Sequence, residues 1–171
     1  LTYTYSIDGY ALYSPDAYTA VTTVDSEYMG LLDKSLFANP VAIDNPGDMV
    51  TDDDGNVYIA DTGNNRIVVL DRYYKVRFVI TEFRNDQGVA DALTAPQGVF
   101  VTDENIWVCD SGANRIVAFD RDGNFDRLVE EPESELFESD SVYKPVAMAV
   151  DQYGRLYVVS STTYQGIIVM T

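Results

Sequence analysis

The sequence predicts an all-β fold made of repeated four-stranded antiparallel units, and three observations support this prediction. Residues 61–71 return as residues 110–120, with seven of eleven positions identical. Prolines open three stretches of similar pattern at Pro46, Pro96 and Pro145, which are 50 and 49 residues apart. Short apolar runs follow each proline and alternate with polar turns. A pattern that recurs at this spacing indicates an array of small units that bury their apolar faces against one another.

The charge balance is strongly acidic and excludes one class of partner. Eleven basic and 28 acidic residues among 171 give a formal net charge of −17, and the chain contains no histidine. Nucleic-acid affinity rests mainly on lysine and arginine neutralising phosphate, so we expect no nucleic-acid binding and no attraction to anionic membrane surfaces. With 46% hydrophobic residues the chain is expected to be globular.

Cysteine content and hydropathy indicate neither disulfides nor membrane spans. Cys109 is the single cysteine, so no disulfide can form within the chain. No apolar run approaches the ~18–20 residues that span a membrane, so the sequence predicts no membrane insertion. The chain begins at Leu1 rather than at methionine, and it combines tyrosine-rich polar strands with few basic residues. We take these features to favour a trimmed protein that is extracellular or on the cell surface.

Residues 1–44 form a tyrosine-rich segment ahead of the repeats. Within it, residues 17–25 alternate in side-chain type and are dense in β-branched residues, which predicts a strand. In a ring of repeats this strand could complete the last unit. Residues 27–44 contain Gly30, Pro40 and paired apolar residues, which predict a short helical turn followed by a loop.

Residues 45–171 divide into three units, namely 45–94, 95–143 and the incomplete 144–171. Strands are predicted at 49–50, 57–60, from Arg66, and at 76–80 in the first unit; at 99–101, 106–109, from Arg115, and at 125–129 in the second; and at 148–150 and 156–159 in the third. Acidic and glycine residues between the first two strands suit a tight hairpin, because glycine reaches positive φ without steric cost. Four short strands joined by hairpins and repeated at this spacing are typical of the blades of a β-propeller.

The motif of the first two units resembles a known family. A proline, an apolar strand, an Asp/Gly turn, Val-Tyr-Ile-Ala-Asp and then Thr-Gly-Asn-Asn-Arg-Ile-Val resemble the NHL repeat over about residues 45–171. The resemblance implies a β-propeller, usually six-bladed when closed, with the fourth strand of each blade outermost. The third unit departs from the motif at residues 160–167, which lack both its aspartate and its arginine.

An aspartate and an arginine recur five residues apart in the repeated stretch, as Asp61 with Arg66 and Asp110 with Arg115. Such a pair could serve acid–base chemistry, but active sites rarely repeat in successive blades. Across a hairpin loop the two side chains can meet and can also bond loop amides. We therefore predict structural ion pairs that fix the turn between the second and third strands, and no catalytic or metal-ligating set.

Three other features could suggest chemistry. Residues 52–56 (Asp-Asp-Asp-Gly-Asn) resemble a calcium loop, but the spacing is not that of an EF-hand and position 63 is glycine, which favours a hairpin turn. Cys109 has apolar neighbours and no histidine base in the chain, so it is predicted to be buried rather than nucleophilic. Six acidic residues between positions 130 and 140 form either a solvated loop or a contact surface for a cationic partner.

The aromatic residues allow two interpretations. Tyr58, Trp107 and Tyr157 occupy equivalent positions in the three units, which favours packing in the core over stacking on a sugar ring. Tyr73 and Tyr74 lie in a turn instead, where we expect them to be exposed.

These features favour a non-catalytic interaction module that presents loops on a rigid scaffold and binds a protein or a glycan. The alternative is a fragment of a propeller enzyme, a lactonase-like hydrolase or a lyase, whose metal site lies in blades outside these residues. The resemblance implies that such enzymes hold a divalent metal in the central tunnel, and Asp48 is the one acidic residue that we place on a first strand. No cofactor is predicted.

Three units cannot close a six-bladed ring, so we expect two broad apolar faces that need a cover. Either a longer chain supplies the other blades, or two copies meet as a homodimer that completes a ring.

Overall fold

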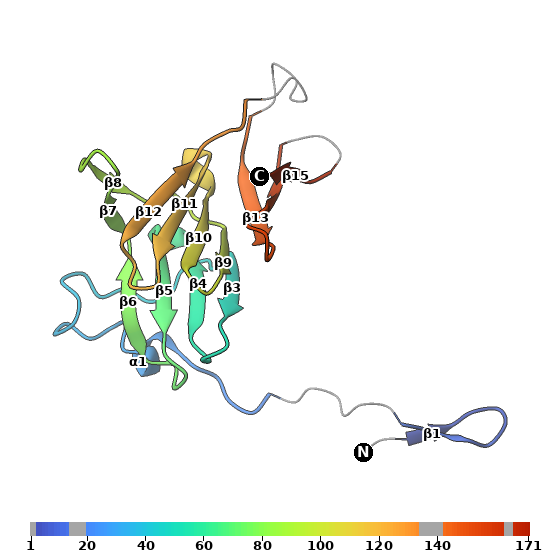
Figure 1. Ribbon diagram of the computed structural model, residues 1–171. Helices are drawn as coiled ribbons and strands as arrows, with labels where there is room; N and C mark the ends of the chain where they lie inside the picture. Colours follow the sequence, from blue (N-terminus) through green and yellow to red (C-terminus); the bar gives the residue numbers. More distant parts are fainter. Residues whose placement is uncertain (1–2, 14–19, 134–141, 163–165) are drawn as a thin grey trace.

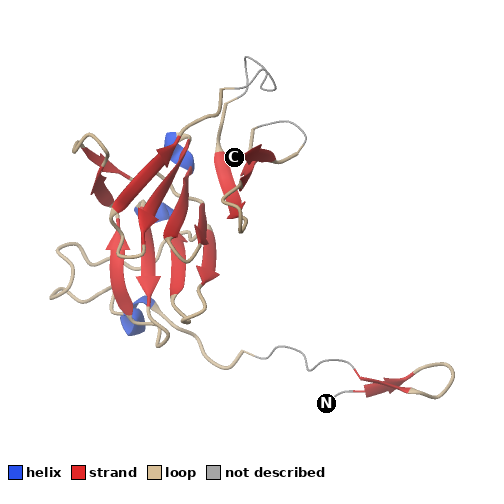
Figure 2. Ribbon diagram, viewed as in Figure 1, coloured by secondary structure: helices blue, strands red, loops and turns tan. Residues whose placement is uncertain are grey.

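The computed structural model describes residues 3–13, 20–133, 142–162 and 166–171. Most of the regular structure is β-strand, as Figure 2 shows, and the one α-helix among the described residues, α1 (Ser26–Met29), has four residues. Two large sheets stand against each other, a third lies beside the second, and the hairpin β1–β2 lies apart from them (Figure 1). Among the described residues, no helix is long and apolar enough to cross a membrane.

The strands form three main antiparallel sheets, which we call blades one, two and three. Their strand orders are β3-β4-β5-β6, β9-β10-β11-β12 and β13-β14-β15. The bounds are β3 (Asp48–Thr51), β4 (Val57–Asp61), β5 (Arg66–Leu70), β6 (Val76–Ile80), β9 (Gly98–Val101), β10 (Asn105–Asp110), β11 (Arg115–Asp120), β12 (Phe125–Val129), β13 (Pro145–Val150), β14 (Leu156–Ser160) and β15 (Ile168–Met170). The strands predicted at 76–80 and 125–129 coincide with β6 and β12, and each of the other bounded predictions in residues 45–171 lies within an observed strand.

Successive blades pack face to face through apolar layers. Tyr58 of blade one and Phe119 of blade two belong to the layer between these blades, and both are fully buried. Trp107 of blade two and Val158 of blade three belong to the next layer. Because successive side chains of a strand point to opposite faces, blade two offers one face to blade one and the other to blade three. This stacking of equivalent sheets gives the partial propeller ring predicted from the repeats.

The other face of blade one is covered by the segment of residues 24–43. It packs Met29, Leu31 and neighbouring apolar side chains against a buried layer that includes Val68. The helix α1 begins at an N-cap, where Asp25 accepts a hydrogen bond from the Tyr28 amide at 2.7 Å. One of the two faces expected to be bare is therefore covered by a helical turn and loop.

The strand predicted at residues 17–25 does not appear in the part of it that the structure describes. Residues 20–25 form a loop, and residues 17–19 lie outside the described residues. Dense β-branched residues favour an extended chain, but a strand also needs a partner, and residues 20–25 pair with no strand among the described ones. Most of the acidic stretch at 130–140 also lies outside the described residues, because only 130–133 are included.

The outward face of blade three is exposed. Ala149, Tyr157 and Val169 share this face, since they pair across the three strands. Val159 and Val169 are 41% and 51% exposed, whereas side chains on the corresponding faces of blades one and two are buried by the next blade. The homodimer that could cover this face stays a prediction.

Two hairpins were not predicted. The first is β1 (Tyr3–Tyr5) with β2 (Ala11–Tyr13), and the second is β7 (Glu82–Arg84) with β8 (Ala90–Ala92). The β7–β8 hairpin lies in the connection between blades one and two, and Phe83 anchors it by stacking on Phe125 at 5.5 Å between ring centroids.

Candidate functional site

The predicted Asp–Arg pairs form ion pairs at the loops between the second and third strands. Arg66 Nε lies 2.6 Å from Asp61 Oδ2, and Arg115 Nε lies 2.8 Å from Asp110 Oδ2. Both aspartates are fully buried. Each loop is a short 3-10 turn, η1 (Thr62–Asn64) in blade one and η2 (Ser111–Ala113) in blade two. We call this end of the blades the loop edge.

The same aspartates hold the segment that leads into each blade. Asp61 Oδ1 accepts a hydrogen bond from the Asp44 amide at 2.8 Å, and Asp110 Oδ1 accepts one from the Thr94 amide at 2.6 Å. The glycine of the motif allows this close approach, because a Cβ added at Gly112 would lie 2.6 Å from the Thr94 carbonyl oxygen. The motif therefore closes each blade on its own entry segment.

Arg115 also fixes the β7–β8 hairpin. Its guanidinium binds both carboxylate oxygens of Asp91, at 2.7 and 2.9 Å. The hydrogen bonds from Arg115 lower the pKa of Asp91, whereas burial raises the pKa of Asp110. Arg66 has a different second partner, since its Nη2 donates to the Val41 carbonyl at 2.9 Å.

Hydroxyl groups of the motif join neighbouring blades at the loop edge. Thr62 Oγ1 donates to the Pro96 carbonyl at 2.6 Å, and Ser111 Oγ donates to the Pro145 carbonyl at 2.5 Å. In blade three, Ser160 replaces the aspartate and accepts from the Lys144 amide at 2.9 Å. These contacts fit a structural role for the four predicted residues, which stays a prediction until stability is measured.

The opposite end of the blades carries hairpin turns with a common frame, and we call it the turn edge. An aspartate begins the turns 52–56, 71–75, 120–124 and 151–155, and its Oδ1 accepts from the amides two and four residues later at 2.8 to 3.1 Å. The amide three residues after each aspartate donates to the aspartate carbonyl. Each turn is therefore held by the same three hydrogen bonds.

The position three residues after the aspartate has a left-handed backbone in all four turns. Gly55, Gly123 and Gly154 have φ values of 81°, 86° and 79° there. The fourth turn has Tyr74, with a φ of 62°. Glycine adopts this conformation without a Cβ clash, whereas a tyrosine is strained in it.

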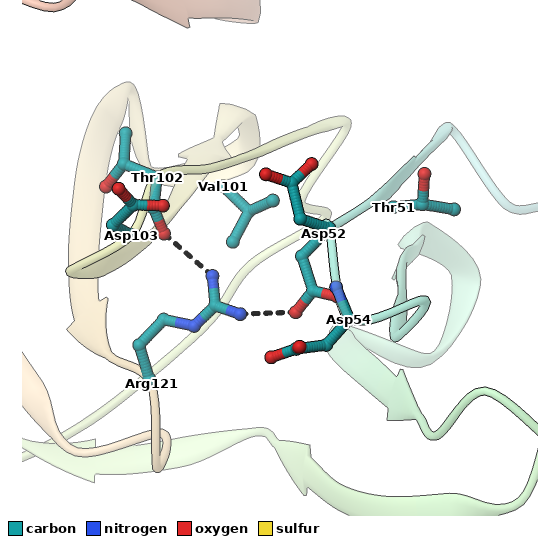
Figure 3. Close-up of a pocket in the computed structure, with 8 residues that line it drawn as sticks. Thr51, Asp52, Asp54, Val101, Thr102, Asp103 and Arg121 are labelled. Carbon is teal, nitrogen blue, oxygen red and sulfur yellow. Dashed lines mark hydrogen bonds and ion pairs between the residues drawn. The ribbon is translucent and has the colours of Figure 1, made fainter.

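A cavity of about 280 Å³ lies between blades one and two, at the turns that join the first and second strands of each blade. Arg121 crosses this cavity (Figure 3). Its guanidinium binds Asp52 and donates to the Thr102 carbonyl at 2.7 Å. Tyr58 donates to the same Asp52 oxygen at 2.9 Å. Burial acts to raise the pKa of Asp52, but hydrogen bonds from Asn56, Tyr58 and Arg121 outweigh it and lower that pKa to about 2.

A second cavity, of about 570 Å³, lies between the corresponding turns of blades two and three. Trp107 lines it with the Arg127 guanidinium 5.8 Å from its ring centroid. The indole Nε1 is buried and has no hydrogen-bond partner among the residues described. In blades one and three an aspartate of the turn accepts from the tyrosine hydroxyl at the equivalent position, whereas the corresponding turn of blade two begins with Thr102.

The other candidate residues are engaged in packing or in backbone contacts. Cys109 is fully buried, and burial, with a smaller effect of the Asp48 charge, raises the pKa of its thiol to about 12. Asp48 Oδ2 accepts from the Val99 amide at 3.1 Å. Within the described ranges, no group of three or more histidine, cysteine or acidic side chains is placed to hold a metal ion. Tyr58 and Trp107 lie in the core, as predicted. The prediction is wrong for Tyr157, which is only half-buried on the outward face of blade three, because no further blade packs against that face among the described residues.

Arg121 is the residue of this region that the sequence did not single out. Its partner Asp52 is 69 residues away, so spacing alone could not connect them. A signal was nevertheless present, because the dipeptide Asp-Arg lies at the end of the third strand in both blades, at 71–72 and at 120–121.

The first blade is similar in sequence to one repeat family. The family model described as NHL repeat matches residues 44–70, which cover the first three strands of blade one. The chain carries an NHL repeat. No curated protein matches the sequence.

Solved structures share the fold of this NHL-repeat chain at low identity. Hydrazine synthase of Kuenenia stuttgartiensis is 14% identical, with a TM-score of 0.55 over 73% of this chain and 32% of that chain. The WD40 β-propeller domain of Doa1 is 12% identical, with a TM-score of 0.53 over 75% of this chain and 38% of that chain. Streptogramin B lyase is 19% identical, with a TM-score of 0.47 over 72% and 39%. The chain thus spans about a third to two fifths of these structures, and it forms part of a β-propeller.

Proposed function

We propose that this chain is a non-catalytic interaction module that holds a protein or glycan ligand against its turn edge. One observation carries the proposal: four hairpin turns share an aspartate-capped frame, yet the side chains that they expose differ. A fixed backbone frame with variable exposed side chains is how propellers and other scaffolds present binding residues.

The two positions that follow each aspartate differ in both charge and size, and all of them are exposed except Arg121, which is paired with Asp52. The two residues after the aspartate are Asp53 and Asp54 in the first turn, Arg72 and Tyr73 in the second, Arg121 and Asp122 in the third, and Gln152 and Tyr153 in the fourth. The cavities of about 280 and 570 Å³ open between turns of successive blades, so a ligand could contact two blades at once.

The groups best suited to chemistry are already engaged elsewhere. The buried Asp61 and Asp110 carboxylates are used by arginine and backbone partners at the loop edge. The Cys109 thiol, with a pKa of about 12, stays protonated at neutral pH. The acidic and histidine-free composition supports our further proposal that the module acts outside the cell.

Binding and turnover can be measured side by side. The labelled chain is applied to a glycan array and to a peptide array, and the same preparation is incubated with lactones and with ligands retained by either array. We expect saturable binding of at least one ligand, with the ligand recovered unchanged. Hydrolysis or elimination of a substrate that persists after controls for contaminating enzymes would instead support the propeller-enzyme alternative and overturn the proposal.

A further inference from the structure

Tyr74 occupies a backbone position that the three equivalent turns give to glycine. Its φ of 62° lies in the left-handed region, beside 81°, 86° and 79° at Gly55, Gly123 and Gly154. The turn hydrogen bond is the same, since the Tyr74 amide donates to the Asp71 carbonyl at 2.8 Å. A bulky residue in this conformation costs free energy that glycine avoids. A strained tyrosine at a position where glycine would fit without strain points to a function of the tyrosine side chain.

Two more exposed tyrosines lie near Tyr74, namely Tyr73 in the same turn and Tyr28 in α1, which contacts the turn through Lys75. Tyr73 and Tyr74 are 69% and 43% exposed, and Tyr28 of α1 is 52% exposed. We call these three residues the tyrosine platform. Lys75 ties the turn to the helix, because its ammonium group donates to the Tyr28 carbonyl and lies 3.6 Å from the Tyr28 ring centroid.

The backbone beneath the platform is held firmly. Asp71 Oδ1 accepts from the Tyr73 and Lys75 amides at 2.8 and 2.9 Å. Arg72 bends back to donate to the Asp54 carbonyl at 2.7 Å, which leaves the tyrosines as the large side chains displayed by this turn. Ordered aromatic side chains lose little conformational entropy on binding, so they make effective contact surfaces.

We propose that the tyrosine platform binds a neutral glycan, an inference that rests on the proposed function and assigns it a place and a ligand class. The faces of tyrosine rings take the C–H faces of sugar rings, and the Lys75 ammonium can bond sugar hydroxyls. A net charge of −17 disfavours an anionic glycan. A stable protein partner needs about 800 Å² per side, whereas three tyrosine side chains offer at most about 250 Å² each, which suits a smaller ligand such as a short glycan.

The test uses the whole chain and four variants. Tyr73→Ala, Tyr74→Gly and Tyr74→Phe alter the platform, and Tyr153→Ala is the matched control. Tyr153 has the same place in the fourth turn as Tyr73 and is 75% exposed. The probes are the soluble neutral polysaccharides mixed-linkage β-glucan, xyloglucan and galactomannan, with polygalacturonate as the anionic probe. Affinity gel electrophoresis measures binding, and urea unfolding measures stability.

We expect at least one neutral polysaccharide to retard the parent chain, while polygalacturonate does not. Tyr73→Ala and Tyr74→Gly should weaken that binding about tenfold, whereas Tyr74→Phe and Tyr153→Ala should bind like the parent. Tyr74→Gly should also raise the urea midpoint, because it removes the strain. Tyr74→Phe keeps the strain and the ring, so its polysaccharide binding and its urea midpoint should both match those of the parent.

Two results would overturn the platform and leave the proposed function standing. One is a Tyr74→Gly chain that is more stable than the parent and binds the same polysaccharide equally well. The other is a chain that binds a peptide but none of the neutral polysaccharides. Turnover of ligand, by contrast, would count against the proposed function itself.

Discussion

The guanidinium of Arg121 in blade two binds the carboxylate of Asp52 in blade one, across 69 residues of sequence. The Tyr58 hydroxyl shares the same carboxylate oxygen. The Asp52 side chain is only 9% exposed, so salt screens this pair less than an open surface pair. The contact joins two blades at the turn edge, as the Thr62 hydroxyl does at the loop edge.

Asp52→Asn should destabilise the protein at neutral pH and have little effect at pH 2. The folded state lowers the pKa of Asp52 from 3.8 to about 2, so its charged form adds stability above about pH 4. This contribution, about 2 kcal/mol, is lost as the pH falls through the folded pKa. Urea unfolding of parent and variant across this range measures it, with the exposed Asp53→Asn as the control. A difference that stays constant from pH 7 to pH 2 would contradict the assignment.

Arg115→Ala and Arg66→Ala should each lower the unfolding free energy by about 1–3 kcal/mol, because each leaves a buried aspartate without its cation. The two variants should differ in proteolysis. Arg115 also binds Asp91 on β8, so its loss should expose the β7–β8 hairpin to limited digestion, which Arg66→Ala should not do. Should either variant unfold like the parent but lose a ligand, that arginine would be functional rather than structural.

Cys109 should resist alkylation in the folded chain. Burial raises the pKa of its thiol to about 12, so the reactive thiolate is scarce at pH 8 and the sulfur is shielded. Iodoacetamide labelling followed by mass spectrometry should find no adduct before urea is added and full labelling afterwards. Rapid labelling of the native chain would show that the layer between blades two and three opens readily.

The strands of blades one and two could be predicted closely because their sequence pattern is local and occurs twice. β6 and β12 coincide with the predicted ranges, and β5 and β11 begin at the predicted arginines. Hairpin strands need only alternation, turn residues and short connections, all of which the sequence displays. The β7–β8 hairpin was missed because it occurs once and depends on the distant Phe83–Phe125 and Asp91–Arg115 contacts.

The turn edge was only partly predictable. Exposure of Tyr73 and Tyr74 followed from their place in a turn, and the structure agrees. The strain at Tyr74 is a matter of its backbone angle φ, which only the structure gives. The sequence does contain a hint, because aligning the turns at Asp71 and Asp120 places Tyr74 opposite Gly123. The Arg121–Asp52 contact could not be predicted this way, because it depends on how two blades are rotated against each other.

The most direct test of the binding edge is hydrogen–deuterium exchange of the whole chain with and without a ligand retained by the arrays. We predict slower exchange in one or more peptides from the turn edge, residues 52–56, 71–75, 120–124 and 151–155, and unchanged exchange in the loop edge at 61–66 and 110–115. Protection confined to the loop edge, with the turn edge unchanged, would contradict the account.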